Sequence, residues 1–198
     1  MKKHHLTAAI QNALMPARAE AASDQPAADN QSTRSWYTIS ALAGSEPAVE
    51  IYIYDVIGYW GISAQQFISD CRAAGVFSAK QINLHIHSPG GDVMDGFAIY
   101  NTLARLTCKI DIWNDGLAAS MASVILCLPN ATVHMPSNAW VMIHKPWSGT
   151  VGNADDLRDT ADWLDRNEAL LLNAYEKKTG KPREELAALL SADTWLDG

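Results

Sequence analysis

The stretch that most constrains the fold runs from Lys109 to Leu128, with Ser120 at its centre. Apolar and polar residues alternate at its start, small residues precede Ser120, and apolar residues then continue to Leu128 without a turn residue. This order predicts a strand, a tight turn and a buried helix that begins at Ser120. A serine there can cap the helix, or it can act as a nucleophile beside the positive end of the helix dipole. The stretch alone leaves both roles open.

Composition narrows the class of protein. The chain has 198 residues, 48% of them hydrophobic, which is enough for one well-buried domain. A net charge of −7 argues against nucleic-acid or anionic-membrane partners, because both require clustered Lys and Arg. The three cysteines form no CxxC motif and indicate free thiols in a reducing compartment. No apolar run is long enough to span a membrane and the first residues make a poor export signal, so we expect a cytoplasmic protein.

Two regions differ in composition. Residues 1–46 are rich in Ala, Ser, Asp, Asn and Gln, which predicts a low-complexity, disordered N-terminal segment. Residues 47–198 are expected to form the folded domain, with a boundary near Glu46–Pro47. The pattern stops at Asp197–Gly198 without a closing strand or helix, so the C-terminus is interpreted as truncated.

Strand and helix patterns alternate along the domain. We expect strands at 50–55, 81–87, 109–113, 131–134 and 139–144, and helices at 64–74, 93–106, 121–128, 154–178 and 183–190. Repeated strand–helix–strand units predict an α/β fold with a mostly parallel sheet. The helix at 154–178 is highly charged with a narrow apolar stripe (Leu157, Ala161, Leu164 and Leu171), so we expect it to project from the core or to contact a partner.

Gly90 and Gly91 follow a predicted strand and precede a predicted helix. The third glycine of a dinucleotide-binding motif is absent and no Gly-Lys-Ser/Thr follows, so a phosphate site is disfavoured. The glycines can serve a tight turn, or they can present a backbone N–H to a substrate oxygen. Both interpretations stay open.

The histidines differ in how well their positions suit a catalytic role. His144 ends an apolar strand, which is where parallel sheets place catalytic groups, although it can also be an ordinary strand-end residue. His85 and His87 share one strand face without a carboxylate or cysteine at a complementary spacing, and His134 is interpreted as structural. No metal site and no cofactor are predicted.

Ser120, His144 and Asp193 together suggest a catalytic combination. Alone, Asp193 is typical of a helix cap or a turn. A serine hydroxyl needs a base to take its proton, and the base needs a carboxylate to hold its tautomer and its cation. The order Ser–His–Asp differs from that of α/β-hydrolases, and Gly116–Ser120 is not a G-x-S-x-G motif.

These residues resemble the proteolytic subunit of the Clp protease. Ser88–Gly91 resembles its Ser-Pro-Gly-Gly turn, and Gly116–Met121 resembles its Gly-x-Ala-Ala-Ser-Met nucleophile turn. Met142–His144 resembles its strand-end histidine motif, and Asp193–Leu196 stands at the position of its aspartate motif. The separations between the motifs are also close to those of the family. The resemblance covers about residues 47–198 and implies a ClpP/crotonase-like fold.

The resemblance implies a serine endopeptidase. Ser120 would be the nucleophile, His144 the general base and Asp193 its orienting partner. The backbone N–H groups of Gly91 and Met121 would form the oxyanion hole.

The same resemblance implies how the substrate and other subunits bind. Ser88, Gly90 and Gly91 would lie beside a peptide that binds as an added strand. The helix at 154–178 resembles the handle that interlocks two rings of subunits, so a homo-oligomeric ring is expected.

Departures from the family pattern indicate which kind of Clp-like protease to expect. His87 stands where the family usually has Asn, and residues 50–58 and 61–67 resemble phage and prophage head-maturation proteases. We therefore expect capsid or scaffold precursors as substrates, in a bacterial host cell or in a phage procapsid, with a Clp-type ATPase as a less favoured partner. A crotonase-type acyl-CoA enzyme and an inactive assembly protein with the same fold are the alternatives.

Overall fold

The computed structural model describes residues 35–42, 47–58 and 63–198. Its strands are β1 (Tyr37–Leu42), β2 (Ala48–Ile53), β3 (Gln81–Ser88), β4 (Lys109–Ala119), β5 (Ala131–His134), β6 (Trp140–Ile143) and β7 (Thr194–Asp197). Its helices are α2 (Ala64–Ala73), α3 (Val93–Ala104), α4 (Met121–Ile125), α5 (Ala154–Thr179) and α6 (Arg183–Ser191), with a 3₁₀ turn, η1, at Val76–Ser78. Most of the segment predicted to be disordered, residues 1–34 and 43–46, lies outside the described residues.

The strands form one sheet with a parallel centre and antiparallel edges. Its order is β1-β2-β3-β4-β6-β7, and β5 also pairs with β4. β2, β3, β4, β5 and β6 pair in parallel, whereas β1 and β7 run antiparallel to their neighbours. The predicted α/β fold with a mostly parallel sheet is therefore confirmed.

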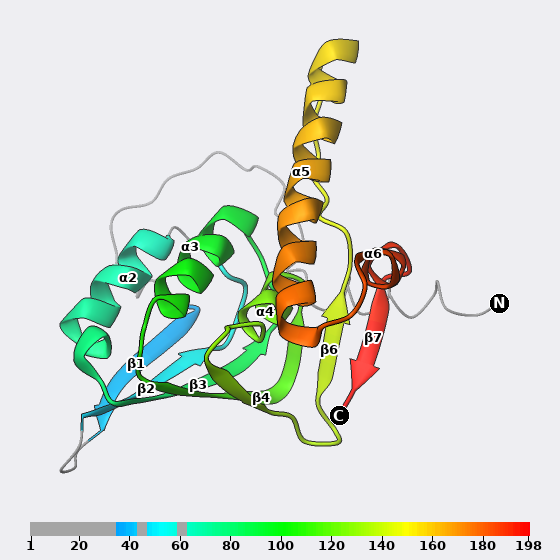
Figure 1. The fold of residues 1–198 in the computed structure, drawn as a ribbon. Helices are drawn as coiled ribbons and strands as arrows, with labels where there is room; N and C mark the ends of the chain where they lie inside the picture. Colours follow the sequence, from blue (N-terminus) through cyan, green and yellow to red (C-terminus); the bar gives the residue numbers. More distant parts are fainter. Residues whose placement is uncertain (1–34, 43–46, 59–62) are drawn as a thin grey trace, which may run out of the picture. The chain divides into compact units, whose positions relative to one another are not determined.

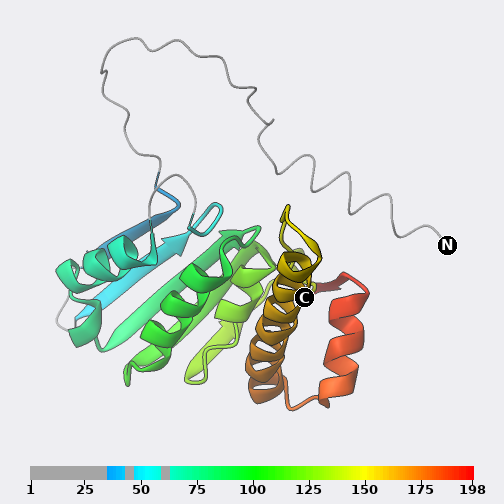
Figure 2. The ribbon, with the colours of Figure 1, turned by 90° about the horizontal axis from the view of Figure 1, so that it is seen from above.

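The helices cover one face of this sheet. Figures 1 and 2 show α2, α3 and α4 side by side over the same face of the strands. Alternation fixes which strand residues meet them, because Ile82, Leu84 and Ile86 of β3 are fully buried between more accessible neighbours. Among the described residues, no helix is both long enough and apolar enough to cross a membrane.

Two elements near the predicted site differ from expectation. β4 continues beyond Trp113 to Ala119, because its last residues pair with β6 after its register with β3 shifts. The prediction that the domain has no closing strand was wrong, since β7 pairs with β6 along its length. A four-residue strand is too short to give a clear periodic pattern, and here main-chain pairing defines it.

The sheet also begins before the predicted boundary near residue 47. β1 pairs with β2, and Trp36 beside it is fully buried. The Trp36 ring stacks on Phe67 at 5.6 Å between centroids, and the Tyr37 hydroxyl donates to Asp70 at 2.6 Å. These contacts join residues 35–42 to the domain.

The long helix α5 has two unlike halves. A capping box at Asn153 starts it, and Gly180 in the left-handed conformation ends it. Leu171 and Tyr175 in its second half are buried, whereas Leu157 is 48% exposed. The first half extends away from the sheet (Figure 1), as expected for a projecting helix.

We predict that Trp36→Ala lowers the free energy of unfolding by about 3 kcal/mol or more, because it empties a buried aromatic site. Urea denaturation measures the change. Val151→Ala is the control, since Val151 is fully exposed and its loss should alter stability by less than about 0.5 kcal/mol. Equal stabilities for the two variants would contradict the inclusion of Trp36 in the core.

Candidate active site

Ser120 occupies a strained junction between strand and helix. β4 ends at Ala119 and α4 begins at Met121, so Ser120 alone makes the turn, with φ 52° and ψ −126°. A positive φ is uncommon for a residue other than glycine, and such strain clusters at functional sites. The Ser120 side chain makes no capping hydrogen bond, although it stands at the N-cap position. Of the two roles left open by the sequence, this geometry favours the reactive one.

His144 lies next to Ser120 because their strands are paired. Ala119 of β4 is the register partner of Met142 of β6, and the Ser120 N–H donates to the Met142 carbonyl at 2.8 Å. The two strands therefore end side by side. His144 Nε2 lies 2.8 Å from Ser120 Oγ, within the distance required for proton transfer between them.

The surroundings of His144 favour its neutral form. Burial lowers the pKa of His144 below the ordinary value of 6.5, and the negative charge of Asp193 opposes this with a smaller upward effect. A neutral imidazole can accept a proton from the serine hydroxyl. His144 is therefore in the state that a general base requires at neutral pH.

Asp193 comes close to His144 through the pairing of β6 and β7. Thr194 is the register partner of Ile143 in this antiparallel pair, so one further step places Asp193 opposite His144. Asp193 is exposed, has a φ of 48°, and makes no hydrogen bond to His144. Its charge acts on His144 without a direct contact, so the structure brings the carboxylate near the imidazole but not into a bonded triad.

The glycine turn packs against the Ser120 junction. Gly90 has a φ of 95°, and a Cβ there would lie 2.6 Å from the Ser120 Cβ and 2.8 Å from the Met121 nitrogen. Only glycine permits this approach. Ile57 holds the turn from the other side, accepting from the Asp92 N–H at 3.0 Å and donating to the Gly90 carbonyl at 2.8 Å. The predicted glycine segment and the Ser120 turn are thus neighbours.

Ser88 supports the glycine turn from inside the protein. It is fully buried, so its side chain is not available to a bound peptide, contrary to the predicted substrate contact. Its hydroxyl donates to the Asp55 carbonyl at 2.6 Å and accepts from the Gly90 N–H at 3.1 Å. Ser88 therefore shapes the turn and does not line its surface.

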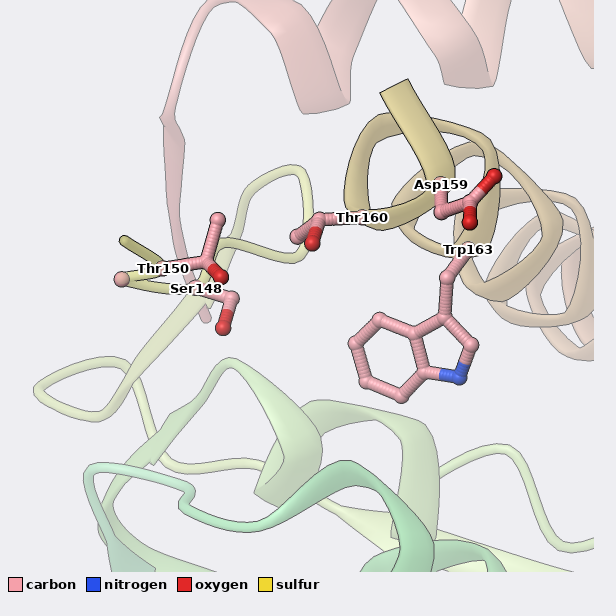
Figure 3. A pocket seen from close by; sticks show the side chains of 6 residues that line it. Ser148, Thr150, Asp159, Thr160 and Trp163 are labelled. Carbon is pink, nitrogen blue, oxygen red and sulfur yellow. The ribbon is translucent and has the colours of Figure 1, made fainter. Parts of the chain in front are cut away.

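A separate pocket lies beside the first half of α5. It has a volume of about 350 Å³ and is lined by Ser148, Gly149, Thr150, Asp159, Thr160 and Trp163. Figure 3 shows Ser148 and Thr150 of the loop before α5 on one side and the Trp163 indole on the other. None of the predicted catalytic residues lines this pocket.

Two other histidines in the described part of the chain lie beside carboxylates. His85 Nδ1 lies 2.7 Å from Asp115 Oδ2, and His134 Nε2 lies 3.0 Å from Asp111 Oδ1. The His134 ring also stacks on Trp113 at 4.0 Å between centroids. Within the described part of the chain, no three His, Cys, Asp or Glu side chains gather as metal ligands.

The sequence did not predict three residues around Ser120. Ile57 fixes the glycine turn, and Ser123 and Tyr175 form a buried hydroxyl pair behind α4. Ser123 had a local signal, because a serine one turn into a helix can bond a carbonyl of the preceding turn. Tyr175 had none, since it lies 52 residues farther along the chain.

The fold is α/β, and at the carboxyl end of its parallel strands Ser120 Oγ and His144 Nε2 lie within hydrogen-bonding distance. Residues 65–198 match the model of the Clp protease family, and the chain belongs to this family. The chain is 36% identical over 127 residues to an ATP-dependent Clp protease proteolytic subunit of Dehalococcoides mccartyi strain 195. It is 36% identical over 126 residues to proteins of the same description from strains BAV1 and CBDB1.

These matches cover part of each protein. The match to the strain 195 relative spans 60% of this chain and 60% of that relative, and the other two matches span 59% of each.

We predict that Gly90→Ala strongly slows labelling of Ser120 by a fluorophosphonate probe. The new methyl group would push against the Ser120 and Met121 backbone, and alanine also disfavours the positive φ. Gly149→Ala is the matched control, because a Cβ at Gly149 meets nothing within 4 Å. Intact-protein mass spectrometry measures the labelling rates. Equal rates for the two variants would contradict the close packing of Gly90 against Ser120.

We predict that the labelling rate of Ser120 falls as the pH falls through the pKa of His144, with a midpoint below 6.5. Because the charge of Asp193 raises that pKa, Asp193→Asn should move the midpoint to lower pH. Asp197→Asn removes the same charge from β7 and should leave the midpoint unchanged. An unchanged or higher midpoint for Asp193→Asn would contradict the assignment.

Proposed function

We propose that the protein is a serine endopeptidase that cleaves peptide bonds through an acyl-enzyme. The observation that carries the proposal is the 2.8 Å contact between Ser120 Oγ and His144 Nε2 in a member of the Clp protease family. The alternative of an inactive assembly protein requires no such contact. A crotonase-type acyl-CoA enzyme would have no use for the Ser–His pair.

The reaction begins when Ser120 Oγ attacks the carbonyl carbon of the scissile bond. His144 Nε2 takes the hydroxyl proton as the C–O bond forms, and then gives it to the leaving amine nitrogen as the C–N bond breaks. The acyl ester on Ser120 remains. A water molecule attacks this ester with His144 again as base, which releases the carboxylic acid and restores the serine hydroxyl.

Asp193 is proposed as the electrostatic partner of this histidine. Its carboxylate favours the imidazolium that forms in each proton transfer, which agrees with the upward effect of its charge on the pKa of His144. Loss of that charge should raise the free energy of the charged intermediate.

Two backbone N–H groups are proposed to bind the oxyanion. Met121 is the first residue of α4, so its N–H has no acceptor within its own helix and lies at the positive end of the helix dipole. Gly91 belongs to the glycine turn that packs against the same junction. Donors placed in this way stabilise the charge that develops on the substrate oxygen.

The substrates and partners are proposed from the family and from α5. A peptide is proposed to lie along the segment at Gly90 and Gly91 as an added strand. Leu157, Trp163 and Leu170 of α5 are 43% to 50% exposed, which suits contacts between subunits of a homo-oligomeric ring. The phage head-maturation role, with capsid or scaffold precursors as substrates, stays a prediction, as does partnership with a Clp-type ATPase.

We predict that a fluorophosphonate probe labels Ser120 and that Ser120→Ala abolishes the labelling. Peptide hydrolysis should fall by about 10⁴-fold or more in Ser120→Ala and in His144→Ala, because each removes a member of the catalytic pair. Mass spectrometry of the labelled protein, with a co-expressed capsid precursor as a candidate substrate, measures both effects. Ser148→Ala is the control for an exposed serine, and full labelling of Ser120→Ala would refute the proposal.

A further inference from the structure

A chain of buried hydroxyl groups connects α5 to the backbone of Ser120. Ser123 Oγ lies 2.6 Å from the Ser120 carbonyl oxygen and 2.7 Å from the Tyr175 hydroxyl. Ser123 is 2% exposed and Tyr175 is 5% exposed. The hydrogen bond of His144 goes to the Ser120 side chain, whereas Ser123 bonds the Ser120 main chain, so the two buried hydroxyls act on the backbone of Ser120.

The two hydrogen bonds between these hydroxyls and the Ser120 carbonyl are donated in the same direction, from Tyr175 toward Ser120. The Ser120 carbonyl can only accept, so the Ser123 hydroxyl donates to it. The Ser123 oxygen must then accept from the Tyr175 hydroxyl, because its single proton is already used. The Ser123 N–H donates to the same carbonyl at 3.0 Å, so the Ser120 oxygen accepts two hydrogen bonds.

The carbonyl held in this way belongs to the peptide that carries a proposed oxyanion donor. The Ser120 C=O and the Met121 N–H share one planar peptide unit and point in opposite directions. A fixed carbonyl therefore fixes the direction of the N–H. Hydrogen bonds accepted by the carbonyl also polarise the peptide and strengthen its N–H as a donor.

We propose that Ser123 and Tyr175 are positioning residues that aim the Met121 N–H at the oxyanion. The inference rests on the proposed function, because it assumes that Ser120 reacts and that Met121 binds the developing charge. Ser123 acts directly on the Ser120–Met121 peptide, and Tyr175 acts through Ser123.

The local structure explains why this peptide needs support. α4 has five residues, so few helical hydrogen bonds stabilise its first turn. Ser120 has a positive φ, and rotation of its backbone to another conformation would relieve the associated strain. Two donors from Ser123, backed by Tyr175 on the much longer α5, oppose that relaxation.

The test measures how fast a fluorophosphonate labels Ser120 in the 198-residue chain, and it separates the maximal labelling rate from the probe affinity. We expect Ser123→Ala to lower the maximal rate by roughly tenfold, which is less than the loss of a whole oxyanion donor. Tyr175→Phe should lower it by about threefold to tenfold, because one buried hydrogen bond is removed while the ring is kept. Probe affinity and the pH midpoint should stay unchanged, since His144 is untouched.

The double variant gives a sharper result. Because Tyr175 acts through Ser123, Ser123→Ala combined with Tyr175→Phe should be no slower than Ser123→Ala alone. Independent packing effects would multiply instead. Tyr100→Phe is the matched control, since the Tyr100 hydroxyl bonds the Cys127 carbonyl beyond the other end of α4 and should leave the rate unchanged.

The outcomes separate this inference from the proposed function. Labelling of Ser120 at the wild-type rate in both single variants would overturn the positioning role and leave the peptidase proposal intact. Multiplying losses in the double variant would also overturn it. Failure of the wild-type protein to label at Ser120 would overturn the proposed function and this inference together.

Discussion

The parallel pairing of β4 with β6 is the constraint on which the site depends. The pairing joins the carboxyl end of β4, Leu117 to Ala119, to Trp140 to Met142 of β6. Ser120 directly follows the paired segment of β4, and His144 comes two residues after Met142, the last paired residue of β6, so main-chain hydrogen bonds bring the two side chains together. A shift of one residue in this register would turn the neighbouring side chains to the opposite face and separate the pair.

Around this pairing, the protein stabilises an unfavourable backbone with contacts from distant parts of the chain. Gly90 of the glycine turn packs against the backbone on either side of Ser120, and the Ser123 hydroxyl donates a hydrogen bond to the Ser120 carbonyl. Main-chain hydrogen bonds from Ile57 stabilise the glycine turn in turn. Such convergence explains how a serine can keep a positive φ, because each contact offsets part of the strain.

The sequence predicted the central elements well because their patterns are local. Alternation identified β3, and helical spacing identified α3. The strand–turn–helix pattern located Ser120 at its junction, and the apolar run before His144 located that residue at a strand end. β1 and β7 were missed because short edge strands carry little periodicity and are defined by their partners. The burial of Ser88 and the contact between Ser123 and Tyr175 depend on packing across long separations, which no local pattern encodes.

β7 lies at the edge of the sheet, where it can open more easily than the central strands. This strand has four residues, and β6 is its one partner among the described strands, so opening it costs less than unfolding the central strands. Such an opening would withdraw the Asp193 carboxylate while the alcohol and the imidazole stayed in contact. The Ser120–His144 pair and the Asp193 carboxylate thus belong to regions of unequal local stability, and fraying of β7 would remove the charge near His144 while the core stayed folded.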